Sequence, residues 1–207
     1  MRRRRHSVPS SPLGGHATVV LDWRYDSPSD ILVDVPPDVI TLRNRVNGEA
    51  TPVQLTSAKM PHDSGDYILG GEMNFTRAAD ANFVDSWMFV SIIKLDKDTK
   101  PVIKLTTDRA TKTINVLKYV KGNGEFVVAL MGMIEDKEFC STSTAKEVKY
   151  KLTDKKVKNL SGLTFSNCQL ASLGLIVRGL TYDDIPEIRD EMYNWAVDKG
   201  LITNART

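Results

Sequence analysis

The sequence predicts a mainly β protein of the α+β class. We expect a single antiparallel, sheet-rich, sandwich-like domain over residues 16–207, preceded by a disordered basic arm (residues 1–15) and ending in an amphipathic helix (residues 184–199). Strand-length segments, apolar or alternating, recur up to residue 177, and the apolar period then changes from two to between three and four. The 207 residues, 41% hydrophobic and 26% charged, suffice for one hydrophobic core but are few for two.

The first 15 residues carry four consecutive arginines, Arg2–Arg5, and two prolines, and they offer few apolar side chains for burial. Such a segment is expected to stay disordered. It is either a solvated tail or an electrostatic contact to the phosphates of nucleic acid or of an anionic membrane, where each arginine contributes about 1 kcal/mol. Because no apolar stretch follows the arginines, we predict no secretory signal.

In the first half of the domain, the pattern predicts four strands, and residues 44–66 read as a long polar loop rich in turn residues. In the first strand, alternation places Asp22 and Arg24 on the face opposite Val19 and Trp23. We interpret Asp22 and Arg24 as a structural ion pair, and a catalytic role is the less favoured alternative. The predicted strands are 16–23, 31–35, 39–42 and 67–75.

A hairpin is predicted at the centre of the sheet, because Gly122 and Gly124 tolerate the positive φ of a tight turn between residues 113–121 and the apolar run 126–134. A second hairpin is predicted for residues 85–95 and 101–105, and residues 135–146 read as a polar connection. The strand at 148–152 has a lysine-bearing face, which suits a sheet edge. The last predicted strands are 160–165 and 170–177.

The C-terminal helix begins at Asp184-Ile-Pro-Glu187 and ends at Gly200. Its apolar stripe is expected to dock on the sheet, while its acidic face is either solvated or a mate for a basic patch on a neighbouring molecule. The stripe consists of Ile185, Ile188, Met192 and Trp195, and the outward face includes Glu187, Asp190, Glu191, Asn194 and Asp198.

Charge is unevenly distributed along the chain, although the net charge is only +2. Residues 17–93 carry 5 basic and 11 acidic side chains, a net charge of −6, whereas residues 94–158 carry 15 basic and 9 acidic ones, a net charge of +6. We call these the acidic segment (17–93) and the basic segment (94–158). Such segregation predicts surfaces of opposite sign within one domain.

The residues that enzymes and metal sites need are not found in a recognisable pattern. No histidine lies at metal-ligand spacing from Cys140 or Cys168, two cysteines are too few for a disulfide scaffold, and no nucleophile elbow or phosphate loop is present. We therefore predict no catalytic residues, no metal, no cofactor and no small-molecule substrate, and a reducing intracellular setting. The uncharged run 160–177 contains too many polar residues for a membrane span.

A basic arm with Arg2–Arg5, a β-rich core and the helix Ile185-Pro-Glu-Ile-Arg-Asp-Glu-Met-Tyr-Asn-Trp195 together resemble the matrix proteins of rhabdoviruses, including plant-infecting ones. The resemblance implies a non-enzymatic protein of the virion and host cytoplasm, peripheral to the membrane. Such a protein self-associates and bridges viral nucleoprotein to an anionic membrane surface. Expected contacts to phosphate, membrane or RNA are Arg2, Arg3, Arg4, Arg5, Lys118, Lys121, Lys149 and Lys151, and expected self-association residues are Glu187, Asp190, Glu191 and Trp195.

Two further likenesses stay open as alternatives. Gly14-Gly15 followed by Leu21-Asp22-Trp23-Arg24 is similar to a strand of plant-virus movement proteins, and the arm-plus-β-core organisation is similar to jelly-roll coat proteins with an RNA-binding arm. Both alternatives imply binding of single-stranded RNA. An enzyme built around Asp22 and Arg24 is the third and least favoured hypothesis.

Overall fold

The structure is a computed structural model that describes residues 19–24, 31–33, 39–43, 45, 50–56, 72–75, 86–94, 102–106, 111–115, 124–135, 137–144, 149–152, 162–166, 168–177 and 179–203, several of the strands through their backbone alone. The expected arm, residues 1–15, lies outside these ranges.

The described strands form two antiparallel sheets. The six-stranded sheet has the order β1 (Val19–Arg24), β13 (Gln169–Val177), β6 (Ser86–Lys94), β9 (Phe126–Ile134), β10 (Lys137–Thr142), β11 (Lys149–Leu152). The seven-stranded sheet has the order β2 (Ile31–Val33), β3 (Val39–Arg43), β4 (Ala50–Thr56), β5 (Glu72–Phe75), β12 (Gly162–Ser166), β7 (Val102–Thr106), β8 (Thr111–Asn115).

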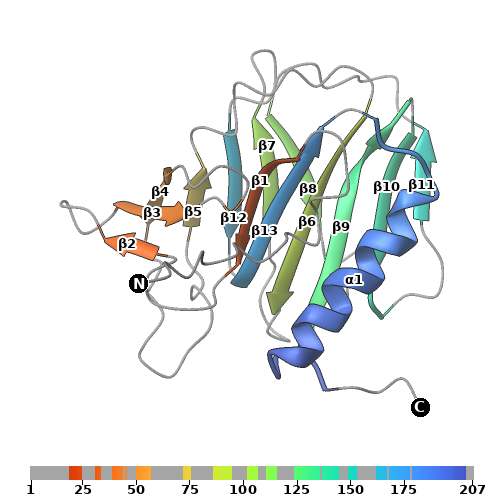
Figure 1. The fold of residues 1–207 in the computed structure, drawn as a ribbon. Coiled ribbons are helices and arrows are strands. Elements are labelled where there is room, and N and C mark those ends of the chain that lie inside the picture. Colours follow the sequence, from red (N-terminus) through yellow and green to blue (C-terminus); the bar gives the residue numbers. More distant parts are fainter. Residues whose placement is uncertain are drawn as a thin grey trace, which may run out of the picture.

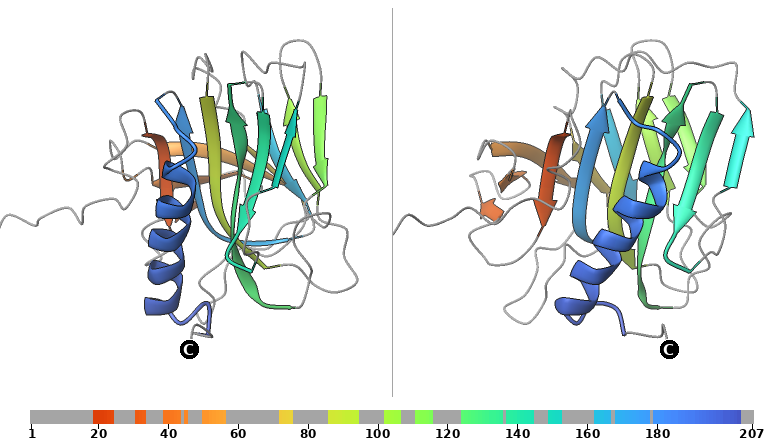
Figure 2. Two further views of the ribbon diagram at one scale, coloured as in Figure 1. Left: turned by 90° about the vertical axis from the view of Figure 1, so that its right-hand side faces the viewer. Right: turned by 45° about the vertical axis from the view of Figure 1, so that its right-hand side comes forward.

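The helix α1 (Asp184–Asp198) lies across one face of the six-stranded sheet, and the seven-stranded sheet lies beyond the opposite face (Figures 1 and 2). A mainly β, antiparallel protein with a C-terminal helix is therefore confirmed. Within the described part of the chain, no helix is both long and apolar enough to cross a membrane.

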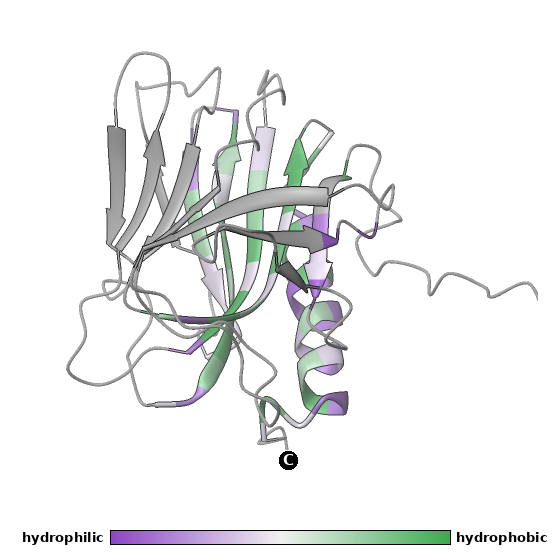
Figure 3. Ribbon diagram, turned by 90° about the vertical axis from the view of Figure 1, so that its left-hand side faces the viewer, coloured by the Kyte–Doolittle hydropathy of each residue, from purple (hydrophilic) through white to green (hydrophobic). Residues whose placement is uncertain are grey.

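Strand β9 lies in the interior of the six-stranded sheet, and all nine of its residues are buried. The face toward α1 carries Met88, Val90 and Val128, which pack with the buried helix residues Ile188 and Met192. Burial of one such side chain contributes about 1.5–3 kcal/mol. Because both faces of the strand are covered, its apolar run is continuous rather than alternating. Figure 3 shows hydrophobic colouring on the strands beside α1 and both hydrophilic and hydrophobic colouring along the helix.

Gly132 fixes how closely β9 approaches its neighbours. A Cβ atom at this position would overlap the backbone oxygen of Trp87 and would lie 2.9 Å from the Cα of Met88 and 3.0 Å from Cε1 of Phe139. Phe139 is the direct cross-strand partner of Gly132 on β10, and its ring fills the space above the glycine. Only glycine fits at this crossing point.

Both predicted hairpins are wrong. Strand β8 pairs with β7 in the seven-stranded sheet, whereas β9 pairs with β6 and β10 in the six-stranded sheet. Strands β6 and β7 are likewise in different sheets. The chain passes from one sheet to the other at each of these connections, so strands that are consecutive in sequence become members of opposite layers.

Two segments predicted as connections contain strands. Strand β4 lies inside the expected loop 44–66, and β10 lies inside the expected polar connection 135–146. In β10, Phe139 and Cys140 are buried although the surrounding sequence is polar. Residues of β10 are buried because the strand pairs with β9, and a tertiary contact of this kind is not visible in the local sequence pattern. The prediction that residues 148–152 form an edge strand is confirmed, because β11 ends the six-stranded sheet.

Local details differ from expectation at β1 and at the start of α1. A register shift between Val19 and Leu21 places Val19 against the core under the helix, so Val19 and Trp23 do not share a face. The helix is preceded by Asp183, and Asp184 accepts hydrogen bonds from the backbone N–H (2.6 Å) and the hydroxyl (2.8 Å) of Thr181 instead of capping the helix. Gly200, at φ +71°, follows the helix as predicted.

Candidate functional site

A buried ion pair lies on β1, under the C-terminal half of α1. The guanidinium of Arg24 donates two hydrogen bonds to the Asp22 carboxylate, from Nε to Oδ1 at 3.1 Å and from Nη2 to Oδ2 at 2.8 Å. The Asp22 side chain is 0% exposed and that of Arg24 is 2% exposed. A bidentate pair of this kind compensates for the desolvation of both charges.

The helix covers this pair with an aromatic ring. The Cζ atom of Arg24 lies 5.5 Å from the ring centroid of Trp195, and Nζ of Lys199 lies 5.9 Å from the same ring. A cation over the face of a tryptophan is attracted by the ring quadrupole, by about 2 kcal/mol when desolvated. The stack therefore fastens the C-terminal half of α1 to the edge strand β1.

Two further polar residues adjoin the pair. The backbone N–H of Arg45 donates to the carbonyl oxygen of Asp22 at 2.8 Å. Burial and the nearby charge of Arg24 lower the pKa of Arg45, and the Asp22 charge acts in the opposite direction. Ser172, the direct cross-strand partner of Arg24, is fully buried, and its hydroxyl has no hydrogen-bond partner among the described residues.

This arrangement suits a structural role better than a chemical one. The carboxylate of Asp22 is enclosed and engaged on both oxygens, so it has no open side from which to act on a substrate. Within the described ranges, no three His, Cys, Asp or Glu residues come together as a metal site. The cluster joins β1, α1 and Arg45, which lies two residues after the end of β3.

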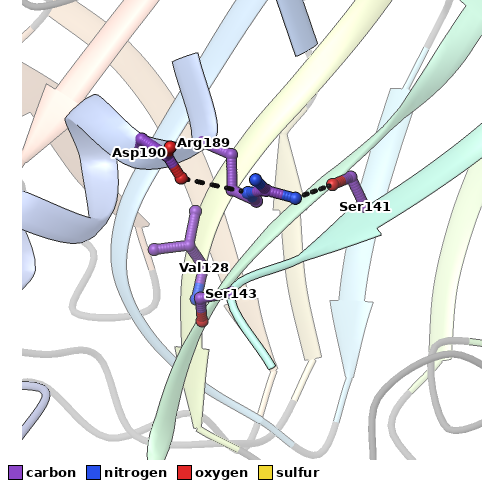
Figure 4. Close-up of polar contacts among 5 residues, drawn as sticks. All are labelled: Val128, Ser141, Ser143, Arg189 and Asp190. Atoms are coloured by element: carbon purple, nitrogen blue, oxygen red, sulfur yellow. Dashed lines mark hydrogen bonds and ion pairs between the residues drawn. The ribbon is translucent and has the colours of Figure 1, made fainter. Parts of the chain in front are cut away.

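The N-terminal half of α1 is held by other polar contacts. Nη1 of Arg189 donates to the hydroxyl of Ser141 on β10 at 3.4 Å, while its Nε atom contacts Oδ1 of Asp190 at 3.2 Å (Figure 4). The same view shows Ser143, whose hydroxyl accepts a hydrogen bond from the backbone N–H of Val128 at 3.1 Å. The Arg189–Ser141 contact joins α1 to β10, and the helix packs on both β9 and β10.

The residues expected to mediate self-association divide into two groups. Glu187 is exposed, and the side chains of Asp190 (46% exposed) and Glu191 are partly accessible, so these three form an acidic outward face. Trp195 is partly buried against the core and stacked on Arg24, so it belongs to the inside of the protein. Tyr193 and Ala196 of α1 are also buried. The predicted stripe did not include them, and the polar hydroxyl of Tyr193 masks its apolar ring in the sequence pattern.

The residues expected to contact phosphate are only partly described. Lys149 and Lys151 are in the edge strand β11, which pairs on one side with β10. Lys118, Lys121 and Arg2–Arg5 lie outside the described residues. Of the eight residues predicted to contact phosphate, the structure therefore describes two, Lys149 and Lys151, and both are on one sheet edge.

The strand order places strands of the acidic segment and strands of the basic segment on different sides of each sheet, although the only acidic residues of the acidic segment within the described ranges are Asp22 and Glu72. In the six-stranded sheet, β1 and β6 of the acidic segment precede β9, β10 and β11 of the basic segment. In the seven-stranded sheet, β2 to β5 of the acidic segment likewise precede β7 and β8 of the basic segment. In Figures 1 and 2, the strand orders of the two sheets proceed across the molecule in the same sense. Strands β2 to β4 lie at one end of the molecule, and β10 and β11 lie at the other.

The two cysteines are buried and do not form a disulfide. Desolvation raises the pKa of the Cys168 thiol to about 12. Because the thiolate is the reactive form of cysteine, a thiol with this pKa is inert at neutral pH.

Comparison with known proteins gives a likeness of fold alone. No family model and no curated protein matches the sequence. The structure is similar to that of botulinum neurotoxin type C, whose passage into cells depends on interaction with two ganglioside molecules (TM-score 0.55, 10% identity, 84% of this chain and 51% of that chain). It is also similar to the binding domain of botulinum neurotoxin DC in complex with SialylT (TM-score 0.52, 9% identity, 84% and 51%).

The chain spans about half the length of these toxin structures. At such low identity the similarity describes how the strands are arranged and does not carry over what the toxins bind. The resemblance to rhabdovirus matrix proteins stays a prediction, since none of the comparisons bears on it.

Proposed function

We propose that this chain is a non-enzymatic viral structural protein that self-associates and binds a phosphate-bearing partner through its surfaces. The observation that carries the proposal is the strand order, which sets strands of the basic segment at one end of both sheets, with the lysine-bearing strands β11 and β8 as their edges. Segregated charge attracts oppositely charged partners over about 8–10 Å at physiological ionic strength. It therefore favours both self-association and contact with polyanions.

The basic end is the expected contact for phosphate. Its outermost strand in the six-stranded sheet, β11, has the sequence Lys-Tyr-Lys-Leu. Lysines at an edge discourage pairing with other strands and leave their charge available to phosphate groups. The arginines Arg2–Arg5 would add to this contact from the arm.

A non-enzymatic role is supported by how the titratable groups are used. The Asp22–Arg24 pair is enclosed beneath Trp195, and the Cys168 thiol is buried with a raised pKa. The less favoured enzyme hypothesis relies on Asp22 and Arg24. Each instead has a packing role that explains its position.

The matrix form of the proposal is a protein that bridges viral nucleoprotein to an anionic membrane surface, in the virion and the host cytoplasm. The charge sums of the two segments, −6 and +6, support it, because acidic and basic surfaces on one protein would let it contact both a polyanion and a second copy. No small-molecule substrate or cofactor is part of this proposal.

The coat or movement form is a protein that binds single-stranded RNA. The two facing antiparallel sheets favour it, because double-sheet jelly rolls are an architecture of viral capsid domains. In this form, we propose that the two sheets make a jelly-roll-type sandwich and that the basic end contacts the RNA backbone.

One experiment tests the proposal and separates its two forms. Purified protein is titrated with single-stranded RNA, with phosphatidylserine vesicles and with neutral phosphatidylcholine vesicles over a series of salt concentrations. We expect binding to an anionic partner that weakens with salt. RNA binding alone supports the coat or movement form, vesicle binding supports the matrix form, and no binding to either at low salt contradicts the proposal.

A double variant locates the contact. Lys149→Gln/Lys151→Gln is expected to lower the slope of log K against log salt by about 0.7 for each lysine that contacts RNA phosphate. The matched control, Lys94→Gln/Lys199→Gln, removes the same charge from positions beside the Phe126 and Trp195 rings and should change the slope less. Equal effects of the two variants would show that net charge, and not the β11 edge, governs binding.

A further inference from the structure

We propose that the acidic outward side of α1 binds the arginines Arg2–Arg5 of the same chain. This contact gives the basic arm a partner within the molecule and competes with the binding of the arm to phosphate. The contact itself does not depend on the proposed function, whereas its regulatory effect rests on the proposed binding of a phosphate-bearing partner.

Acidic side chains follow the outward side of α1 from its first turn to its last. They recur at steps of four, four and seven residues, which are close to whole turns of a helix, so they share one side. We call them the acidic stripe: Asp183, Glu187, Glu191 and Asp198. Glu191 is partly buried and the other three are exposed. Like charges four residues apart on a helix repel each other, so a cation beside two of them relieves this repulsion.

The two basic residues of the described C-terminal region have contacts of their own. Residues 179–203 carry six acidic and two basic side chains, a net charge of −4. Arg189 donates to Ser141 on β10, and Nζ of Lys199 lies 5.9 Å from the ring centroid of Trp195. Helix α1 packs on β9, β10 and β6 through its buried side (Figure 1), so the excess negative charge belongs to the side that faces away from the sheet. Such a surface favours a cationic partner.

The same chain supplies a segment of matching charge. Arg2–Arg5 are four consecutive arginines, and residues 1–16 contain no acidic side chain. Alternate side chains of an extended segment are about 6.6 Å apart, close to the rise of about 6 Å between residues four apart on a helix. Two arginines of the run can therefore meet two neighbouring carboxylates of the acidic stripe at once, and a guanidinium can bind a carboxylate in a bidentate manner.

The arm is attached close to the helix and is long enough to reach the acidic stripe. Val19, the first residue of β1, packs against the core cluster that also contains the buried side of α1. The 13 residues between Arg5 and Val19 span at most roughly 45 Å, whereas the 15-residue helix is about 22 Å long. A short tether raises the effective concentration of the arginines to about the millimolar range, so that several individually weak ion pairs together populate the contact.

The contact regulates the binding of polyanions. Arginines held on the acidic stripe are not available to phosphate, so a phosphate-bearing partner must displace them from α1. The stripe therefore lowers the affinity of the protein for a polyanion, and neutralising the stripe should raise this affinity. Because all these ion pairs are exposed, the contact should weaken as salt is added.

The contact is tested with a nitroxide label on the arm. Ser7→Cys places a thiol two residues after Arg5, while Cys140 and Cys168 are buried and do not compete for the label. We expect the label to broaden the amide NMR signals of α1 at low salt, within the labelled chain itself. A mixture of labelled chain with unlabelled, isotope-enriched chain shows whether the arm instead reaches the helix of another copy.

Matched variants assign the contact to the acidic stripe. The stripe variant, Glu187→Gln/Glu191→Gln, should reduce the broadening by about 3-fold or more, because two of the ion pairs are lost. The control variant, Glu125→Gln/Glu135→Gln, removes the same charge from exposed positions bonded to the two ends of β9 and should leave the broadening unchanged. Thermal melts of each variant check that the fold is retained.

The regulatory effect is measured as binding to single-stranded RNA and to phosphatidylserine vesicles. The stripe variant should bind at least about 3-fold more tightly than the control variant, because both have lost the same charge but only the stripe variant releases the arm. In the background Arg2→Gln/Arg3→Gln/Arg4→Gln/Arg5→Gln, the stripe and control substitutions should have equal effects on binding.

The outcomes separate this inference from the proposed function. Broadening that is absent, that is equal in the stripe and control variants, or that arises only between copies overturns the contact within one chain. Equal affinities of the two variants for RNA and vesicles overturn the competition, while stripe-dependent broadening upholds the contact. A wild type that binds neither partner at low salt contradicts the proposed function, and the label experiment is independent of that result.

Discussion

The two edge strands of the six-stranded sheet, β1 and β11, both alternate charged with apolar or aromatic residues, but they differ in what covers the charged residues. At β1, the charged residues of Leu-Asp-Trp-Arg are buried, bonded to each other and covered by the helix. At β11, Lys-Tyr-Lys-Leu lies at the outer limit of the sheet, beyond β10. Strand β1 is covered by contacts with α1 and Arg45, whereas in the described part of the chain β11 pairs only with β10.

The difference shows that alternation of charged and apolar residues does not by itself indicate a solvated face. Opposite charges two residues apart, as in Asp22 and Arg24, can form a bidentate pair on one side of a strand and enter the interior together. Two lysines at the same spacing repel each other and have no such option. A strand with two charges at this spacing can be buried more readily when the charges are opposite, as in Asp22 and Arg24, than when they are alike, as in Lys149 and Lys151.

The largest effect is expected when the buried pair is broken. Asp22→Asn keeps the volume of the side chain but leaves the Arg24 guanidinium buried without its counter-charge, and we expect a loss of about 3 kcal/mol or more in the free energy of unfolding. Urea denaturation measures this loss. The double variant Asp22→Asn/Arg24→Met should be less destabilised than the single variant, and a double variant that is at least as unstable would contradict the buried-charge explanation.

Strand β9, in the interior between the two edges, is expected to respond through packing alone. Gly132→Ala would force β9 away from the backbone of Trp87 and Met88, with an expected cost of about 3 kcal/mol. Gly179→Ala is the matched control, because its φ of +67° is strained for alanine but no atom lies within 4 Å of the new methyl group. The control should lose only about 1 kcal/mol in the same denaturation experiment.

A smaller effect is expected from the thiol next to β13, the strand that pairs with β1. The folded-state pKa of Cys168 is raised to about 12 from an ordinary value of 9.0, so between these values the unfolded chain releases a proton that the folded protein keeps. Stability should therefore be fully present below pH 9 and decline as the pH rises toward 12. The decline should be shallower in Cys168→Ala, and identical slopes would count against a buried, protonated thiol.

The smallest effect on stability is expected at the open edge. Lys149→Gln/Lys151→Gln should change the free energy of unfolding by less than about 0.5 kcal/mol, because lysines of an edge strand are expected to be solvated, and solvated charges contribute little to folding. The same substitutions should weaken polyanion binding, as argued above. A marked loss of stability would mean that the β11 lysines are engaged within the fold, which would remove the contrast between the two edges.

Much of the local structure was predictable from particular residues. The helix over 184–198 follows from the spacing of Ile185, Ile188 and Met192, and the burial of β9 follows from its uninterrupted apolar run. The edge position of β11 follows from its lysines. Each of these signals is carried by neighbouring residues on one element, so no knowledge of distant partners is required.

The candidate site was only partly predictable. The Asp22–Arg24 pair follows from two side chains on the same side of a strand, but its burial depends on Trp195, 171 residues after Arg24. The acidic outward side of α1 was expected, and the place of Trp195 in the apolar stripe is confirmed, since the ring packs against the core. Sequence alternation says which residues share a face but not what covers that face.

The sequence by itself determined the helix, most of the strands and the mainly β character of the protein, but not β4 and β10, and it showed that opposite charges are gathered in separate segments. Only the tertiary structure decided which strands pair, that β8 and β9 belong to different sheets, and that the lysine-bearing strands β8 and β11 are edges. The physical reason is the range of the forces. Backbone preference and side-chain periodicity act between near neighbours in the chain, while strand pairing and layer packing depend on apolar surfaces brought together from distant segments.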